Sequence, residues 1–214
     1  MKPRRILSAL SVAGLAGMLL APAASATTGS TGTTGTRSLA AVLTADGNQF
    51  DRNWYDYDIV TEAVLAVVQA KPTSAVALLA DGSVPLTAFL PNDRAFQSLV
   101  ADLTGSRPSA EKDVFGTVAG LGISTVETVL LYHVVPGATI TSKQAAASNG
   151  AALVTAQSGT VGVRVYSRWL PIIELRDQDT DDANPFVNPL ALNINKGNAQ
   201  IAHGITAVLR PVNL

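Results

Sequence analysis

The sequence predicts an α+β domain, and three observations lead to this fold class. Apolar residues recur with a helical period through most of the first 150 residues, and several of these segments begin at a capping residue. From residue 151 onward the apolar period changes to two, which is typical of strands. The chain has 214 residues, 47% of them apolar, which is enough to bury a sizeable core. Helices first and strands last favour an α+β domain over repeating βαβ units.

The first 26 residues have the parts of a secretory signal peptide. A basic start precedes an apolar stretch over 6–20, and Ala24-Ser25-Ala26 is a cleavage site of the A-x-A type. Residues 27–37 are rich in Gly, Ser and Thr, so we expect a flexible tether there. We therefore predict a single exported domain over 38–214, which is secreted or associated with the cell envelope.

Caps and apolar spacing predict the helical part of the chain. Asn92 is expected to cap a helix that follows a short apolar strand. Ser124 with Glu127, and Thr141 with Gln144, have the spacing of capping boxes. The expected elements, in order, are a helix over 38–43, a polar aromatic loop over 46–57, a helix over 58–69, a turn or two of helix over 73–81, a strand over 85–90, helices over 92–103, 111–119 and 125–133, and a small alanine-rich helix after 141.

The second part of the chain is predicted to form strands. Turn residues separate three runs with a period of two, at 153–156, 161–166 and 170–175. An acidic loop with proline is expected over 177–189. Beyond it, Lys196-Gly197-Asn198 is expected to be the turn of a hairpin made of 190–195 and 199–203, followed by a last strand over 205–209.

Composition excludes several classes of partner and site. The chain has no Cys and two His, which leaves neither a disulfide framework nor a thiolate or multi-histidine metal centre, and we predict no metal site and no cofactor. Without residues 1–26 it carries 12 Lys and Arg against 16 Asp and Glu. This acidic balance argues against nucleic acid as a partner. No apolar run after the signal peptide is long enough for a membrane-spanning helix.

Motifs for catalysis and for calcium binding are incomplete. No G-x-S-x-G elbow or phosphate-binding loop occurs, so an enzyme is not expected. Asp177, Asp179 and Asp181 have the first three spacings of a calcium loop. However, Asp182 stands where such a loop requires Gly, and Asn188 stands where it requires Glu. The stretch is expected to be a solvated acidic loop, with calcium binding as the alternative.

Three stretches of the chain resemble the motifs of the fasciclin domain family. They are Thr87-Ala88-Phe89-Leu90-Pro91-Asn92-Asp93-Arg94-Ala95-Phe96, Leu131-Tyr132-His133-Val134-Val135-Pro136-Gly137, and a C-terminal run from Ala199 to Pro211 that contains Ile201, His203 and Ile205. Their order and spacing are similar to one domain of that family over about 38–214. The usual Asp of the C-terminal motif is Thr206 here. The resemblance implies a twisted sheet packed with several helices, and an extracellular role in adhesion without catalysis.

Four residues are the candidates for partner contact. The resemblance points to Tyr132 and His133, although the end of a helix also suits a structural histidine that hydrogen bonds a nearby carbonyl. Trp54 and Tyr55 belong to the aromatic loop over 46–57, where they either stack on a partner or fold back over the core.

The function that we expect is a secreted, non-catalytic binding module. It would serve cell adhesion, or envelope or matrix association, through an extracellular protein or polysaccharide partner. The alternative is an extracellular carrier of a small apolar ligand, because the chain is poor in charge and the aromatic loop could cover a pocket. The sequence does not identify the partner or the oligomeric state.

Overall fold

The computed structural model describes residues 34–213 except 46, 48 and 168–171. The predicted signal peptide, and the predicted tether up to residue 33, lie outside the described residues. The later part of the 27–37 segment is attached to the domain: Gly35 forms a parallel bridge with Asn198, and the Arg37 amide donates to the Asn198 side chain at 2.9 Å. The chain therefore joins the domain slightly before the expected boundary at residue 38.

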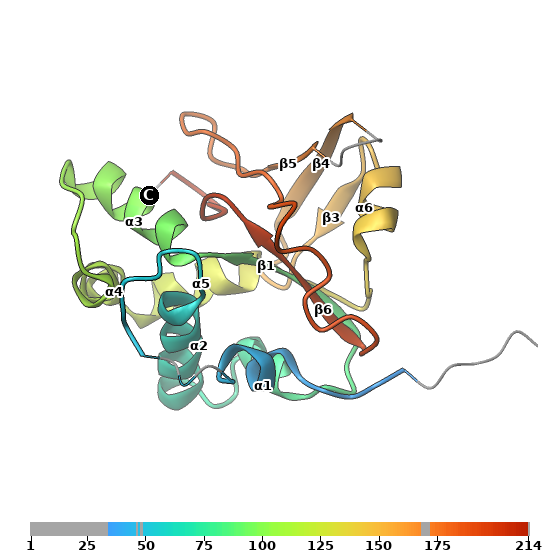
Figure 1. Cartoon of the computed structure of the whole chain (residues 1–214), viewed down its shortest axis with the longest axis horizontal. Helices are drawn as coiled ribbons and strands as arrows, with labels where there is room; N and C mark the ends of the chain where they lie inside the picture. The colour runs from blue at the N-terminus through green and yellow to red at the C-terminus, as the bar shows by residue number, and fades with distance from the viewer. Residues whose placement is uncertain (1–33, 46, 48, 168–171, 214) are drawn as a thin grey trace, which may run out of the picture. The chain divides into compact units, whose positions relative to one another are not determined.

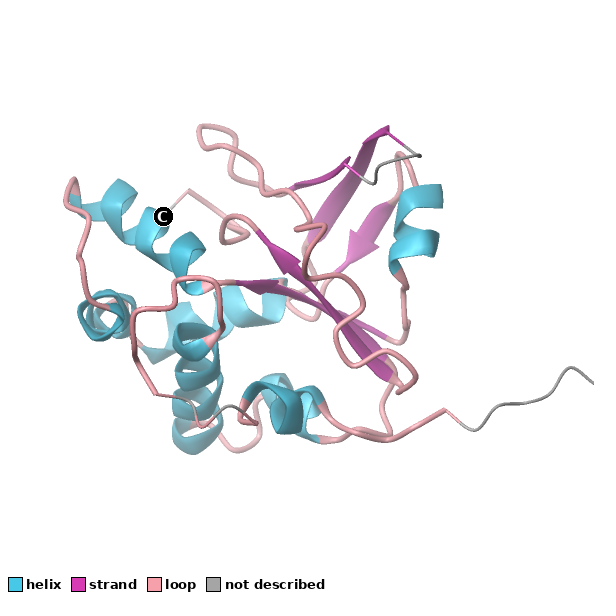
Figure 2. Cartoon of the chain, in the orientation of Figure 1, coloured by secondary structure: helices cyan, strands magenta, loops and turns pink. Residues whose placement is uncertain are grey.

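The described fold is α+β, with helices, one 3-10 helix and two small sheets (Figures 1 and 2). The elements are α1 (Leu39–Leu43), α2 (Asp58–Ala70), the 3-10 helix η1 (Ala75–Ala80), β1 (Leu86–Pro91), α3 (Asp93–Thr104), α4 (Glu111–Gly120), α5 (Ile123–Tyr132), β2 (Val134–Pro136), α6 (Ser142–Ala147), β3 (Ala152–Val154), β4 (Thr160–Ser167), β5 (Ile172–Arg176) and β6 (Gln200–Ile205). The fold class predicted from the sequence is confirmed.

The first sheet has the strand order β2-β1-β6 and lies in the middle of the domain. Helices α1 to α5 lie on one side of it, and the antiparallel sheet β3-β4-β5 with α6 lies on the other (Figure 1). Strand β1 is buried along its whole length because it serves both sides. Leu86, Ala88 and Leu90 belong to the helix-side core, while Phe89 belongs to the core between the sheets. Burial on both faces explains its continuous apolar run.

Several predicted caps are confirmed. The Asn92 side chain accepts from the Ala95 amide at 3.0 Å and begins α3. Ser38 caps α1, and the Thr141 and Gln144 side chains form the predicted capping box of α6.

The capping box predicted at Ser124 and Glu127 is wrong. Helix α5 begins earlier, because Gly122, with a φ of 88°, turns the chain sharply after α4. Both capping-box residues bind Lys71, the residue that follows α2, instead: its Nζ lies 2.5 Å from the Glu127 carboxylate and 3.0 Å from the Ser124 hydroxyl. In η1 the cap is likewise Ser74 rather than Thr73.

The predicted C-terminal hairpin is confirmed only as one antiparallel bridge, and the predicted last strand over 205–209 is wrong. Residues 200–205 form one strand, β6, which pairs in parallel with β1 from Leu86↔Gln200 to Pro91↔Ile205. The 190–195 segment makes a single bridge, Ile194↔Ala202. Positive φ values at Asn193 and Asn195 bend this segment, so that it does not continue as a strand.

No single helix in the described part of the chain has the length and apolar character needed to cross a membrane; α4 and α5 reach them only as a pair, bent by 104°.

Candidate binding surface

The Tyr132 and His133 pair lies in the core. Tyr132 ends α5 with its side chain fully buried, and its hydroxyl donates to the Thr160 carbonyl at 2.7 Å. The Tyr132 ring packs so closely on Gly159 that a Cβ there would lie 2.8 Å from it. Tyr132 thus joins the end of α5 to the start of β4.

His133 uses both ring nitrogens on backbone groups. Its Nδ1 lies 2.7 Å from the Val129 carbonyl, and its Nε2 accepts from the Leu209 amide at 2.9 Å. Burial lowers the pKa of His133 to about 4, so the ring is neutral at physiological pH. These bonds match the structural interpretation left open by the sequence, and neither Tyr132 nor His133 offers an exposed surface to a partner.

Trp54 and Tyr55, the two candidate contact residues of the aromatic loop, have different environments in its described part over 49–57. Trp54 is partly buried against the helix-side core, and its carbonyl accepts from the Arg94 amide at 2.9 Å. Tyr55 points outward and is 74% exposed. The Asp56 carbonyl accepts from the Asp93 amide at 3.2 Å, so the loop is held against the start of α3. Of the two, Tyr55 is the residue that can contact a partner.

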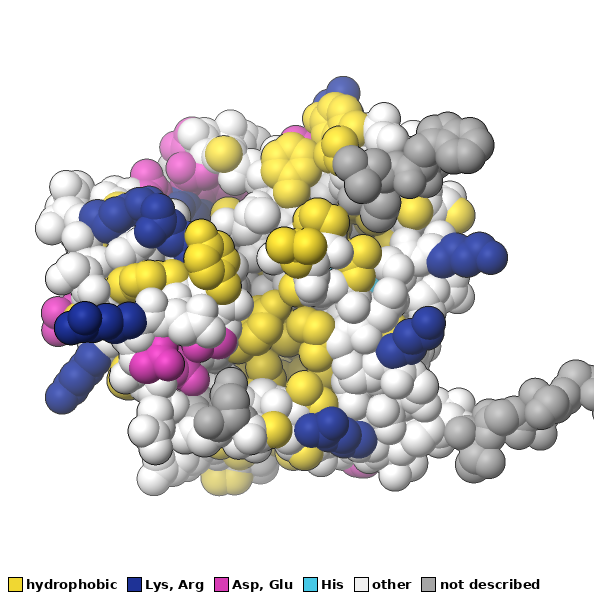
Figure 3. All heavy atoms as spheres, in the orientation of Figure 1, with side chains coloured by type: hydrophobic (Ala, Val, Ile, Leu, Met, Phe, Trp, Pro, Cys, Tyr) yellow, Lys and Arg dark blue, Asp and Glu magenta, His cyan; other side chains and the backbone are white. Residues whose placement is uncertain are grey.

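The outward face of the second sheet carries a surface patch that sequence reasoning missed, in which exposed side chains surround the buried Glu174. We call it the Tyr166 patch: Arg164, Tyr166, Glu174, Arg176 and Phe186. Tyr166 is 51% exposed and Phe186 39% exposed, with ring centroids 6.2 Å apart. The Arg164 guanidinium lies 4.6 Å from the centre of the Tyr166 ring. Hydrophobic side chains gather over this part of the domain in Figure 3.

Glu174 holds the Tyr166 patch together. Its carboxylate accepts from the Tyr166 hydroxyl and from the Arg176 Nε, both at 3.1 Å. Beside the patch, Arg164 and Arg176 border a shallow depression of about 370 Å³, lined also by residues 149–151. Tyr and Arg are enriched where interfaces concentrate their binding energy. The alternation along 160–166 was the signal that could have found the patch, because it points Arg164 and Tyr166 to the same face.

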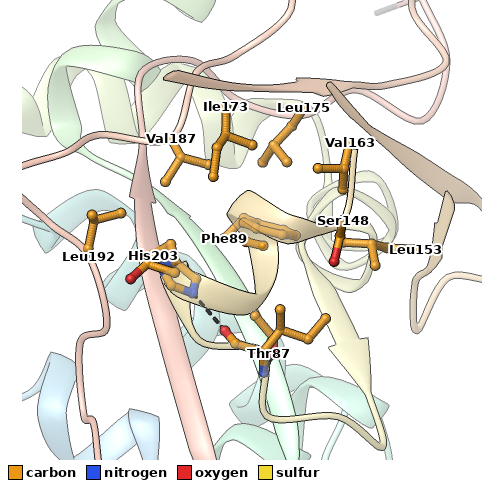
Figure 4. Close-up of a pocket in the computed structure, with 13 residues that line it drawn as sticks. Thr87, Phe89, Ser148, Leu153, Val163, Ile173, Leu175, Val187, Leu192 and His203 are labelled. Atoms are coloured by element: carbon orange, nitrogen blue, oxygen red, sulfur yellow. Dashed lines mark hydrogen bonds between the residues drawn. The ribbon is translucent and has the colours of Figure 1, made fainter. Parts of the chain in front are cut away.

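A closed apolar cavity lies between the two sheets beneath α6 (Figure 4). Phe89, Val163, Ile173 and Leu175 are among its lining residues. The polar group of note is His203, whose Nε2 lies 2.8 Å from the Ile140 carbonyl, and whose other nitrogen accepts from the Asn193 amide. The free volume is about 20 Å³, about what one water molecule needs. A carrier would need this cavity to open.

The hydrogen bonds of both histidines engage backbone groups, so neither ring stands as a base beside a hydroxyl nucleophile. The described residues therefore do not assemble a Ser-His pair of the kind that activates a serine nucleophile.

The acidic loop predicted over 177–189 receives one positive charge from within the chain. Arg210, with its side chain 9% exposed, lies 2.9 Å from Asp102 and 3.5 Å from Asp179, and also pairs with Asp182. The Arg210 amide donates to the Asp177 carboxylate at 2.9 Å. The Arg210 guanidinium therefore lies beside the aspartates for which the sequence suggested calcium binding, as the alternative to a solvated loop.

Comparison with known proteins places these features in a family context. Residues 60–211 match a family model described as the fasciclin domain. Comparison with curated protein sequences gives no match. Among solved structures, the chain is similar to a pair of FAS1 domains from the insect cell adhesion molecule fasciclin I, at 17% identity and a TM-score of 0.49. The similarity covers 71% of this chain and 46% of that one, so the chain spans about half the length of that structure.

Proposed function

Because the chain belongs to the fasciclin domain family, we propose that it is a secreted, non-catalytic binding module that attaches to a cell envelope or extracellular matrix. Fasciclin domains are cell-adhesion-type modules, which supports recognition rather than catalysis as its role. The observation that carries the proposal for this chain is the Tyr166 patch. The patch combines an aromatic pair with two guanidinium groups. Glu174 bonds Tyr166 and Arg176, so these side chains are preorganised for binding a partner.

The chemistry of the patch defines the partner class. Exposed aromatic rings and arginines suit either a sugar polymer, which can stack on a ring and accept hydrogen bonds, or an acidic protein surface. Two arginines beside one carboxylate also make the patch locally positive on a chain whose acidic residues are in excess. Tyr55 is the second anchor, on the 49–57 loop.

Co-sedimentation tests the proposal. The purified chain is pelleted with the cells and isolated envelopes of its producer over a concentration series. We expect saturable pelleting that is at least about tenfold weaker for the double variant Arg164→Ser with Tyr166→Ser, since truncating anchors of this kind costs more than about 1.4 kcal/mol. Leu190→Ser is the matched control, because Leu190 is 95% exposed and lies outside the patch.

Treatment of the envelopes identifies the partner. Loss of pelleting after protease treatment indicates a protein, and loss after periodate oxidation indicates a glycan. Saturable pelleting that the double variant leaves unchanged would move the site to another surface, with Tyr55→Ser as the next variant. Protein that stays in the supernatant throughout would contradict adhesion to the producer's cells.

The alternative function, a carrier of a small apolar ligand, is favoured only by the apolar lining of the cavity beneath α6. An organic extract of protein purified from its native source tests it. An extract that contains a stoichiometric apolar molecule, together with absent pelleting, would replace the adhesion proposal.

A further inference from the structure

Three acidic side chains from separate segments converge beside the 49–57 loop. Asp56 belongs to that loop, Asp93 begins α3, and Glu111 begins α4. Each offers a carboxylate oxygen, and these oxygens all lie within 4.8 Å of one another. Asp56 also belongs to a second such group with Asp51 and Asp58, so the first three stand at the centre of five acidic residues.

Two oxygens of this cluster are buried without a hydrogen-bond partner. Glu111 is 1% exposed, and its Oε1 has no partner, although its Oε2 accepts from the Asp51 amide at 2.6 Å. The Asp56 Oδ1 is likewise buried and unpartnered. A buried, unpaired carboxylate oxygen is costly, because it loses water and gains nothing in exchange.

Among the residues that the structure describes, Asp56, Asp93 and Glu111 form no ion pair with a Lys or Arg side chain. The charged groups that act on Asp93 are the acids Asp56 and Glu111. The acidic residues of the 177–182 loop differ from this cluster, because Arg210 supplies a positive charge to them.

We propose that Asp56, Asp93 and Glu111 form a calcium site that ties the 49–57 loop to the first turns of α3 and α4. The separation of the oxygens fits one ion, because Ca–O distances of about 2.4 Å place two ligands of the same ion up to about 4.8 Å apart. The ligand set is all oxygen. The chain has no Cys, and both His rings are bonded elsewhere, which favours a hard cation. Carboxylates drawn from three segments suit calcium better than magnesium, which keeps most of its water.

The neighbouring contacts explain how the site would act on the fold. The Asp93 carboxylate also accepts from the Ile59 amide at 2.9 Å and from the Asp58 amide at 3.3 Å, so it caps α2. The loop that supplies Asp56 carries Tyr55, which is exposed. A bound calcium would therefore hold α2, α3, α4 and this aromatic loop in one arrangement.

Calorimetric titration and thermal melting of the purified, chelator-treated chain test the site. Calcium chloride is expected to bind with one equivalent and a Kd of about 10⁻⁴ to 10⁻³ M, and to raise the melting temperature by a few degrees at about 2 mM. Magnesium chloride at the same concentration is expected to have a much smaller effect. No heat and no change in melting temperature with calcium would overturn the proposal, as would an equal response to magnesium.

Glu111→Gln is the discriminating variant. The amide oxygen can still accept from the Asp51 amide, while one of the three charges is lost. We expect calcium affinity to fall at least about tenfold, and the metal-free variant to melt no lower than the metal-free wild type, because an unpaired buried charge is gone. The matched control is Asp181→Asn, in the other acidic cluster. Calcium binding retained by Glu111→Gln, or lost by Asp181→Asn, would overturn the assignment of the site.

Discussion

At the scale of single residues, several polar side chains of the core are bonded to specific backbone groups. His133 shows this most clearly, since it joins the last turn of α5 to the Leu209 amide near the C-terminus. Tyr132, beside it, reaches Thr160. Adjacent residues of one motif therefore tie α5 to two different segments.

His133 has a measurable signature in its titration. NMR titration of the histidine rings of the folded chain is expected to give a pKa of about 4 for His133, against about 6.5 for histidine in the urea-unfolded chain. Between pH 6.5 and pH 4, the unfolded chain therefore binds a proton at this residue that the folded chain does not bind. The contribution of this residue to stability is thus complete above pH 6.5 and is lost as the pH falls towards 4, by about 3 kcal/mol in all. A folded-state pKa near 6.5 would contradict the bonded, neutral ring.

At the scale of elements, the acidic loop is mostly accessible to solvent, as expected, but it is anchored by one internal cation. Residues 177–182 lie beside the C-terminal segment because Arg210 pairs with Asp102, Asp179 and Asp182. Asp179 is the most buried of these partners, with its side chain 1% exposed.

Removing the guanidinium should therefore destabilise the domain. Arg210→Met is expected to lower the free energy of unfolding by about 3 kcal/mol, because it leaves buried acids without a counter-charge, although Asp102 and Asp182 keep some contact with water. Urea denaturation at neutral pH measures the change. Arg37→Met, at an exposed position, is the control and should change the stability by less than about 0.5 kcal/mol. Equal effects of the two substitutions would show that the ion pairs contribute little.

At the scale of the whole molecule, the first sheet joins parts of the chain that are far apart in sequence. Gln200, at the start of β6, is fully buried and fully bonded. Its Oε1 accepts from the Leu39 amide, and its Nε2 donates to the Leu78 and Asp81 carbonyls, all at 2.7 Å. One side chain therefore connects α1, the end of η1 and the central sheet.

Gln200→Ala tests this connection. The substitution leaves the buried Leu39 amide without its acceptor, while the Leu78 and Asp81 carbonyls keep the backbone amides of Asp81 and Val84 as donors. We expect it to cost about 2 kcal/mol of unfolding free energy. Hydrogen exchange of the Leu39 amide should accelerate more than that of amides in the second sheet. Gln69→Ala, on the exposed side of α2, is the matched control. Unchanged exchange at Leu39 would contradict the role of Gln200.

What the sequence determined by itself is local. Helix caps such as Asn92 and Thr141 act within three or four residues, so their patterns predicted helices that the structure confirms. The change of apolar period near residue 151 likewise predicted the α+β class, and the ordered motifs identified the family.

Tertiary structure decided the features that depend on distant partners. Residues 199–205 have the local pattern of a hairpin strand, yet β6 pairs in parallel with β1. This arrangement is stabilised because it buries β6 on both faces. Tyr132 and His133 carry polar groups that suit a surface, but backbone partners near 160 and 209 make them part of the core. Asp56, Asp93 and Glu111 have no common motif, and only packing brings their charges together. Local signals act over a helical turn, whereas burial and charge depend on which distant segments meet.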